Sequence, residues 1–135
     1  MTKDLSDHWH NVFHMTTGDN GVQYGDYIPA LWVNKAKFFR VHSSISGNVH
    51  YLKDFNYNFN LNQWYHIEIK QEEKSNGEII FSITMDATII LEVVNTLPQR
   101  FKEVILYESD PWYPSFASFG ELKDLTIVNL DKYVA

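Results

Sequence analysis

Oxygen-bearing side chains gather in two segments that contain turn-forming residues. Residues 16–26 hold three glycines beside acidic and amide residues, and residues 109–115 hold two prolines and an aspartate. Calcium takes six to eight oxygen ligands, which glycine-containing loops can supply. The predicted metal ligands are Asp19, Asn20, Asp26 and Asp110, with calcium as the predicted ion. Turn capping, in which these side chains accept backbone hydrogen bonds, is the alternative.

Aromatic and planar polar residues could bind an organic ligand. Trp112 and Tyr113 lie between Pro111 and Pro114, which restrict the backbone of this segment. Aromatic faces stack on sugar rings or on apolar partner surfaces, and amide or imidazole groups orient such ligands. The predicted ligand-binding residues are Trp112, Tyr113, Tyr57, Asn58 and His50. The alternative for Trp112 is that it folds back as a lid on the core.

The sequence contains no arrangement typical of an enzyme. It has no cysteine and no Gly-x-Ser-x-Gly motif, and the pair Glu72-Glu73 adjoins a predicted turn, where exposed charge is ordinary. His8, His10 and His14 are expected on one face of a strand. A zinc site needs three or four converging ligands, however, and the other histidines are spread over other predicted strands. We therefore predict a protein that is not an enzyme and that binds no zinc.

These candidates must be held by a scaffold, and residues 63–94 give its clearest pattern. Tyr65, Ile67 and Ile69 alternate with polar residues, the period of a half-buried strand. The pair Asn76-Gly77 suits a hairpin turn, and two further strand-like runs follow at 79–85 and 88–94. The pattern predicts three consecutive antiparallel strands.

The rest of the chain continues the strand pattern. Further strands are predicted at residues 8–17, 28–33, 37–44, 49–55, 101–108 and 122–130, and loops at 16–26, 56–62 and 109–115. Pro29 indicates an edge strand or the start of a strand, because proline donates no ladder hydrogen bond. About nine short strands without helical periodicity predict an all-β antiparallel sandwich or barrel. The length of 135 residues fits one domain, residues 1–135.

Charge and hydropathy exclude some partners. The net charge of -6 disfavours binding to nucleic acid or to an anionic membrane, since both require basic patches. No apolar run approaches the roughly 18 residues of a membrane span, so membrane insertion is not expected. The first residues lack the apolar run of a secretory signal. If the protein is extracellular, the sequence is therefore expected to be a mature or excised domain.

Several segments together resemble a known group of domains. Trp64-Tyr65-His66 and the run from Phe81 to Asp86 resemble the Trp-x-His strand, the next strand and the tight turn of laminin-G-like and pentraxin-like modules. Residues 101–107 and 119–127 are similar to the closing strands of that group. Residues 14–17, 25–32 and 109–113 look like a version found in extracellular proteins of invertebrate animals. The resemblance implies a concanavalin A-like jelly roll, a β-sandwich whose members often hold calcium at the rim.

The combined prediction is a non-catalytic extracellular recognition module. It would bind carbohydrate or a protein partner through loops at one rim of the sandwich, with calcium ordering those loops. The galectin run of His, Asn and Arg followed by Trp and Glu-x-Arg is absent, as is the Glu-x-Asp-x-x-Glu strand of family-16 glycosidases. The alternative is a structural or self-associating protein, a homo-oligomer in which exposed aromatics and sheet edges pair the subunits.

Overall fold

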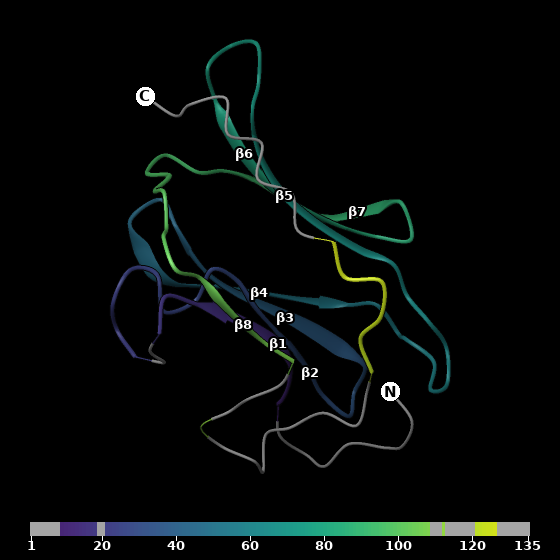
Figure 1. The fold of residues 1–135 in the computed structure, drawn as a ribbon. Coiled ribbons are helices and arrows are strands. Elements are labelled where there is room, and N and C mark those ends of the chain that lie inside the picture. The colour runs from purple at the N-terminus through teal and green to yellow at the C-terminus, as the bar shows by residue number, and fades with distance from the viewer. Residues whose placement is uncertain (1–8, 19–20, 109–111, 113–120, 127–135) are drawn as a thin grey trace.

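The protein is an antiparallel β-sandwich, as the sequence predicts (Figure 1). The computed structural model describes residues 9–18, 21–108, 112 and 121–126, and within them no helix occurs. The strands are β1 (His10–Thr16), β2 (Ala30–Val33), β3 (Phe38–Ile45), β4 (Asn48–Asn56), β5 (Ile67–Glu73), β6 (Ile79–Met85), β7 (Thr88–Val94) and β8 (Ile105–Tyr107). One sheet has the order β4-β3-β2-β1-β8 and the other β5-β6-β7. The two sheets form separate layers that do not close into a barrel.

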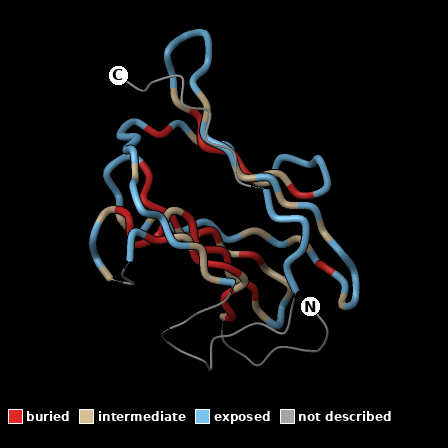
Figure 2. The backbone as a smooth tube through the Cα atoms, in the orientation of Figure 1, coloured by how far each residue is buried: buried red, intermediate tan, exposed pale blue. Residues whose placement is uncertain are grey.

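The hydrophobic core lies between the two sheets, and buried stretches occur in both layers (Figure 2). Leu31, Val33 and Val41 of the five-stranded sheet are at most 1% exposed, as are Ile83 and Met85 of β6. All five belong to one continuous cluster of buried side chains. Because side chains alternate across a strand, the residues between these positions point away from the core.

The predicted three-stranded meander is confirmed in β5, β6 and β7. Ile67 and Ile69 pack against the core, opposite Met85 and Ile83 in the β5–β6 register. The predicted hairpin turn is present, with Ser75 and Asn76 as its central residues. Gly77 has a positive φ of 84°, and its amide donates to the carbonyl of Lys74 at 2.9 Å. Glycine suits this position because the left-handed backbone strains residues that carry a Cβ atom.

Two late strands differ from the prediction. The strand expected at 101–108 is only Ile105–Tyr107, because Glu103 has a φ of 55° and this left-handed backbone interrupts regular pairing before Ile105. The strand expected at 122–130 is not formed over residues 121–126, where Asp124 has a φ of 52°. Residues 127–130 of that prediction lie outside the described residues.

A β-bulge in β1 corrects the expected arrangement of its histidines. The register with β2 shifts between Asn11 and Phe13, so His10 lies opposite Val33 and His14 lies opposite Ala30. Directly opposed residues of antiparallel strands point to the same side of a sheet. Val33 is a core residue, whereas Ala30 lies on the other face. His10 and His14 therefore lie on opposite faces, because the extra residue of the bulge breaks strict alternation.

Candidate binding face on the five-stranded sheet

The candidate site is the outer face of the five-stranded sheet, the face that points away from the core. Phe39 and Val41 of β3 are buried in the core, so Arg40 and His42, which alternate with them, lie on the outer face. Their partners on the edge strand β4 are Asp54 and Leu52, respectively. Leu52 is 49% exposed, Asp54 is exposed, and Arg40 is half-buried. This part of the face is open to solvent.

Next to the open part lies a column of rings, the histidine–aromatic stack, formed by Trp112, His14, Tyr27, His42 and His50. The Tyr27 ring stacks on His42 at 3.6 Å between centroids and on His14 at 4.8 Å, nearly parallel to both. Trp112 adjoins His14 at 5.1 Å, and His50 adjoins His42 at 5.1 Å. His14 is fully buried and His50 is exposed, so the stack runs from the interior to the surface.

The loop between β1 and β2 positions the buried part of this stack. The Nε2 atom of His14 lies 2.6 Å from the carbonyl oxygen of Asp26, as a donor to it. The Oδ2 atom of Asp26 accepts hydrogen bonds from the amides of Gly21 and Gln23 at 3.0 and 2.9 Å. The carbonyl of Tyr27 accepts the Ser44 amide at 2.9 Å. The loop is thus closed on itself and tied to β1 and β3.

His42 and His50 form a hydrogen-bonded pair of imidazoles at the exposed end of the stack. The Nε2 atom of His42 lies 2.9 Å from the Nδ1 atom of His50. Burial lowers the pKa of His42 to about 3, and the nearby His50, His14 and Arg40 lower it in the same direction. His42 is therefore neutral at pH 7, and its ring can both donate and accept a hydrogen bond.

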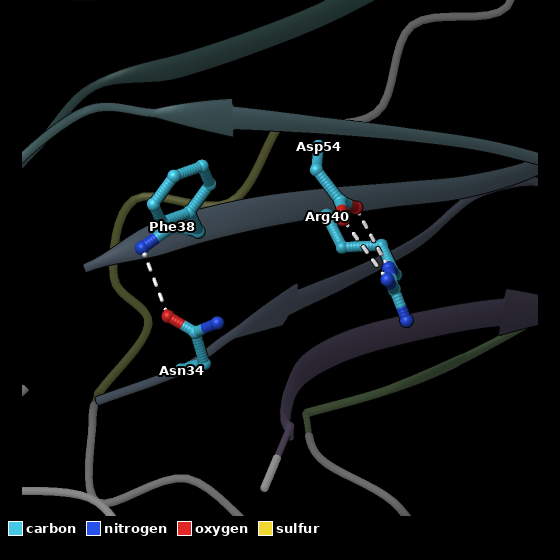
Figure 3. Close-up of polar contacts among 4 residues, drawn as sticks. All are labelled: Asn34, Phe38, Arg40 and Asp54. Carbon is cyan, nitrogen blue, oxygen red and sulfur yellow. Dashed lines mark hydrogen bonds and ion pairs between the residues drawn. The ribbon is translucent and has the colours of Figure 1, made fainter. Parts of the chain in front are cut away.

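Arg40 and Asp54 form a forked ion pair across β3 and β4, drawn in Figure 3. The Nε atom of Arg40 donates to Oδ1 of Asp54 at 2.7 Å, and the Nη2 atom of Arg40 donates to Oδ2 of Asp54 at 2.9 Å. The Trp9 ring lies over the guanidinium at 4.2 Å. Two hydrogen bonds and an aromatic face hold the Arg40 side chain in a fixed orientation.

The turn before β3 is capped by a side chain. The Oδ1 atom of Asn34 accepts a hydrogen bond from the amide of Phe38, the first residue of β3, at 3.1 Å.

Two of the predicted ligand-binding residues belong to the histidine–aromatic stack, but its other three rings lie between them. Trp112 and His50 stand at the two ends of the histidine–aromatic stack. Tyr57 and Asn58 follow the far end of β4, seven residues beyond His50 and so roughly 23 Å away along the strand. Tyr57 packs against Phe39, and partial desolvation and nearby Asp86 raise its pKa. The remaining residue, Tyr113, lies outside the described residues.

Of the predicted metal ligands, only Asp26 lies within the described residues; Asp19, Asn20 and Asp110 lie outside them. Asp26 is 2% exposed, and its two accepted amide hydrogen bonds are those of a turn-capping carboxylate. In the described part of the chain, no group of three or more histidine, aspartate or glutamate residues could hold a metal ion. The calcium site thus stays a prediction.

Sequence reasoning did not find the Arg40–Asp54 fork or the histidine pair. His42 and His50 lie on separate strands, as expected, but the β3–β4 hairpin places their rings side by side, which the sequence did not indicate. The sequence feature that could have placed Arg40 and His42 on the outer face is their alternation with the core residues of the same strand. Pairing them with residues of β4 required the register of the hairpin, which shifts between Ser43 and Ile45.

Comparison with protein families, with curated proteins and with solved structures finds no match to the chain. In the described residues, no helix is long and apolar enough to cross a membrane.

Proposed function

We propose that the protein is a non-catalytic recognition module of the concanavalin A-like type, and that it binds carbohydrate on the open part of the outer face. The observation that supports this most is the Arg40–Asp54 fork, whose side chains are 30% and 38% exposed. A guanidinium and a carboxylate that orient one another keep their outer edges available for hydroxyl groups. Such fixed polar groups bind a polyol with little loss of side-chain entropy.

The spacing of the face also supports a sugar ligand. Arg40 and Asp54 are opposed in one cross-strand row, and His42 belongs to the neighbouring row two residues along β3. Rows that point to the same side of a sheet are about 7 Å apart. This separation is comparable to the width of a hexose ring. One ring can therefore contact the fork and the histidine pair together, beside the Trp9 ring that packs on Arg40.

The loop of residues 21–28 borders this face. We therefore propose that rim loops also take part in ligand binding. Its last part carries Tyr27, which packs under His42, and Trp112 adjoins the other side of the stack. The extracellular location is likewise proposed, and it is supported by the resemblance of residues 14–17, 25–32 and 109–113 to extracellular proteins.

A glycan array followed by isothermal titration calorimetry tests the proposal. Wild-type protein is expected to bind at least one glycan, and Arg40→Met is expected to weaken that binding at least tenfold, since the fork is lost. Lys70→Met is the matched control, because it removes a cation from the other sheet. Absence of any bound glycan, or equal binding by Arg40→Met, would refute the carbohydrate proposal.

Calcium is a separate part of the proposal. Asp26 uses Oδ2 for the loop amides, so a calcium ion there would use Oδ1 and take further oxygens from Asp19, Asn20 and Asp110. Thermal unfolding with calcium and with a chelator tests this, because an ion bound only by the folded protein raises the midpoint. An unchanged midpoint would remove calcium and leave Asp26 as a turn residue.

Self-association is the second candidate function, and β7 carries the observation that favours it. Ile89 is 60% exposed and Val94 is 42% exposed, both on an edge strand. Exposed apolar residues on a free strand edge can pair with another chain. Sedimentation velocity over a range of concentrations tests this proposal. A monomer at every concentration would exclude it, and it would leave the carbohydrate proposal unaffected.

A further inference from the structure

The His42–His50 pair has a geometry that the proposed carbohydrate binding does not require. The two rings come from neighbouring strands, β3 and β4, and each turns one nitrogen toward the other at 2.9 Å. In a hydrogen bond between two imidazoles, one nitrogen carries the proton and the other accepts it. A metal ion can take the place of that proton, because imidazole nitrogens are common ligands of divalent transition metals.

We propose that His42 Nε2 and His50 Nδ1 together bind a divalent transition metal ion such as Zn²⁺ or Cu²⁺, with water completing the coordination. Bond lengths of about 2.0–2.1 Å and a tetrahedral angle place two ligand nitrogens about 3.3 Å apart. The observed separation is 2.9 Å. Metal binding therefore requires an opening of about 0.4 Å and a rotation of both rings that directs both nitrogen lone pairs at the ion.

The Tyr27 ring packs against both ligands. It stacks on His42 at 3.6 Å and is tilted against His50 at 5.6 Å. Tyr27 is 8% exposed and its carbonyl is tied to the Ser44 amide, so this support is anchored in the fold. Neighbours that fix the orientation of ligand rings support metal binding.

The chemistry of this pair differs from that of the predicted calcium loop. Two imidazole nitrogens favour zinc, copper or nickel, whereas calcium requires oxygen ligands. With two protein ligands, one of them the exposed His50, the remaining coordination positions would be taken by water. The inferred site would therefore be an open one, in which an external ligand can replace water.

The test is calorimetric titration of the tag-free full chain with Zn²⁺ and with Cu²⁺. Wild type is expected to bind one ion at the pair, and His50→Gln and His42→Gln are each expected to weaken that binding more than tenfold. His66→Gln is the matched control, since it removes an exposed histidine at residue 66, just before β5 of the other sheet. Circular dichroism confirms that each variant is folded.

Electron paramagnetic resonance of the Cu²⁺ complex provides a second measurement. Hyperfine coupling to two nitrogens is expected in wild type and coupling to fewer in His50→Gln. Absence of metal binding by wild type, or equal affinities of wild type and His50→Gln, would overturn the inference. An equal loss of affinity in His66→Gln would also overturn it, because the effect would then not depend on this pair.

Discussion

Acidification is expected to destabilise the protein through His42. The unfolded chain binds a proton at this residue near the usual pKa of 6.5, whereas the folded protein binds it only at about pH 3. Protons therefore bind preferentially to the unfolded state below pH 6.5, which lowers the free energy of unfolding. The stability that neutral His42 contributes is fully present above about pH 6.5 and is lost as the pH falls from there toward 3.

The size of the effect can be worked from this shift. One pKa unit corresponds to about 1.4 kcal/mol, and between pH 7.5 and pH 5 the two pKa values give a nominal loss of about 2 kcal/mol. His42 is only partly buried, and solvent screens the charge of its protonated ring. We therefore expect a loss of about 1 kcal/mol, which is measurable against a total stability of roughly 5–15 kcal/mol.

Urea unfolding followed by tryptophan fluorescence measures this loss. The free energy of unfolding is determined at pH 7.5 and at pH 5, with a chelator present, for wild type and for His42→Gln. Glutamine can keep a hydrogen bond to His50 but does not titrate. Wild type should lose about 1 kcal/mol more than the variant over this range. Equal losses in the two proteins would refute the reasoning.

Three further predictions concern stability and are checked by the same unfolding measurement at pH 7.5. Met85→Ala is expected to cost about 3 kcal/mol, because Met85 is 0% exposed within the core; a cost below about 1 kcal/mol would contradict this packing. Asp26→Ala is expected to cost about 3 kcal/mol, since it leaves the amides of Gly21 and Gln23 without their acceptor, whereas Asp26→Asn should cost less; equal costs would argue against the capping role. Gly77→Ala is expected to cost about 1 kcal/mol through its φ of 84° alone, because nothing lies within 4 Å of the added Cβ atom; an unchanged stability would contradict that strain.

The sequence was sufficient to predict the meander and the fold class. In β5 and β6, Ile67, Ile69, Phe81 and Ile83 alternate strictly with other residues, and the Asn-Gly turn fixes how the strands meet. Local periodicity and turn chemistry decide these features. Alternation failed in β1, where one extra residue at the bulge moves His14 to the face opposite His10.

The candidate binding face could be predicted only in part. Arg40 and His42 could be placed on a strand face, but their partners Asp54 and His50 follow from the register of a hairpin that shifts between Ser43 and Ile45. Trp112 could be recognised as an aromatic in a stiff segment. Its position against His14 depends on a contact between residues almost 100 positions apart. The alternation of residues within a single strand gives no information about such a contact.

The pairing of β8 with β1 also sets an order for folding. Met15 pairs with Leu106, whereas every other strand pairing described here joins strands that are neighbours along the chain. Closing so long a loop has a large entropic cost, and local hairpins form first. During synthesis β1 can form this pairing, in which the buried His14 lies opposite Tyr107, only after residues 105–107 have been made. The last pairing step therefore completes both the sheet and the interior end of the histidine–aromatic stack.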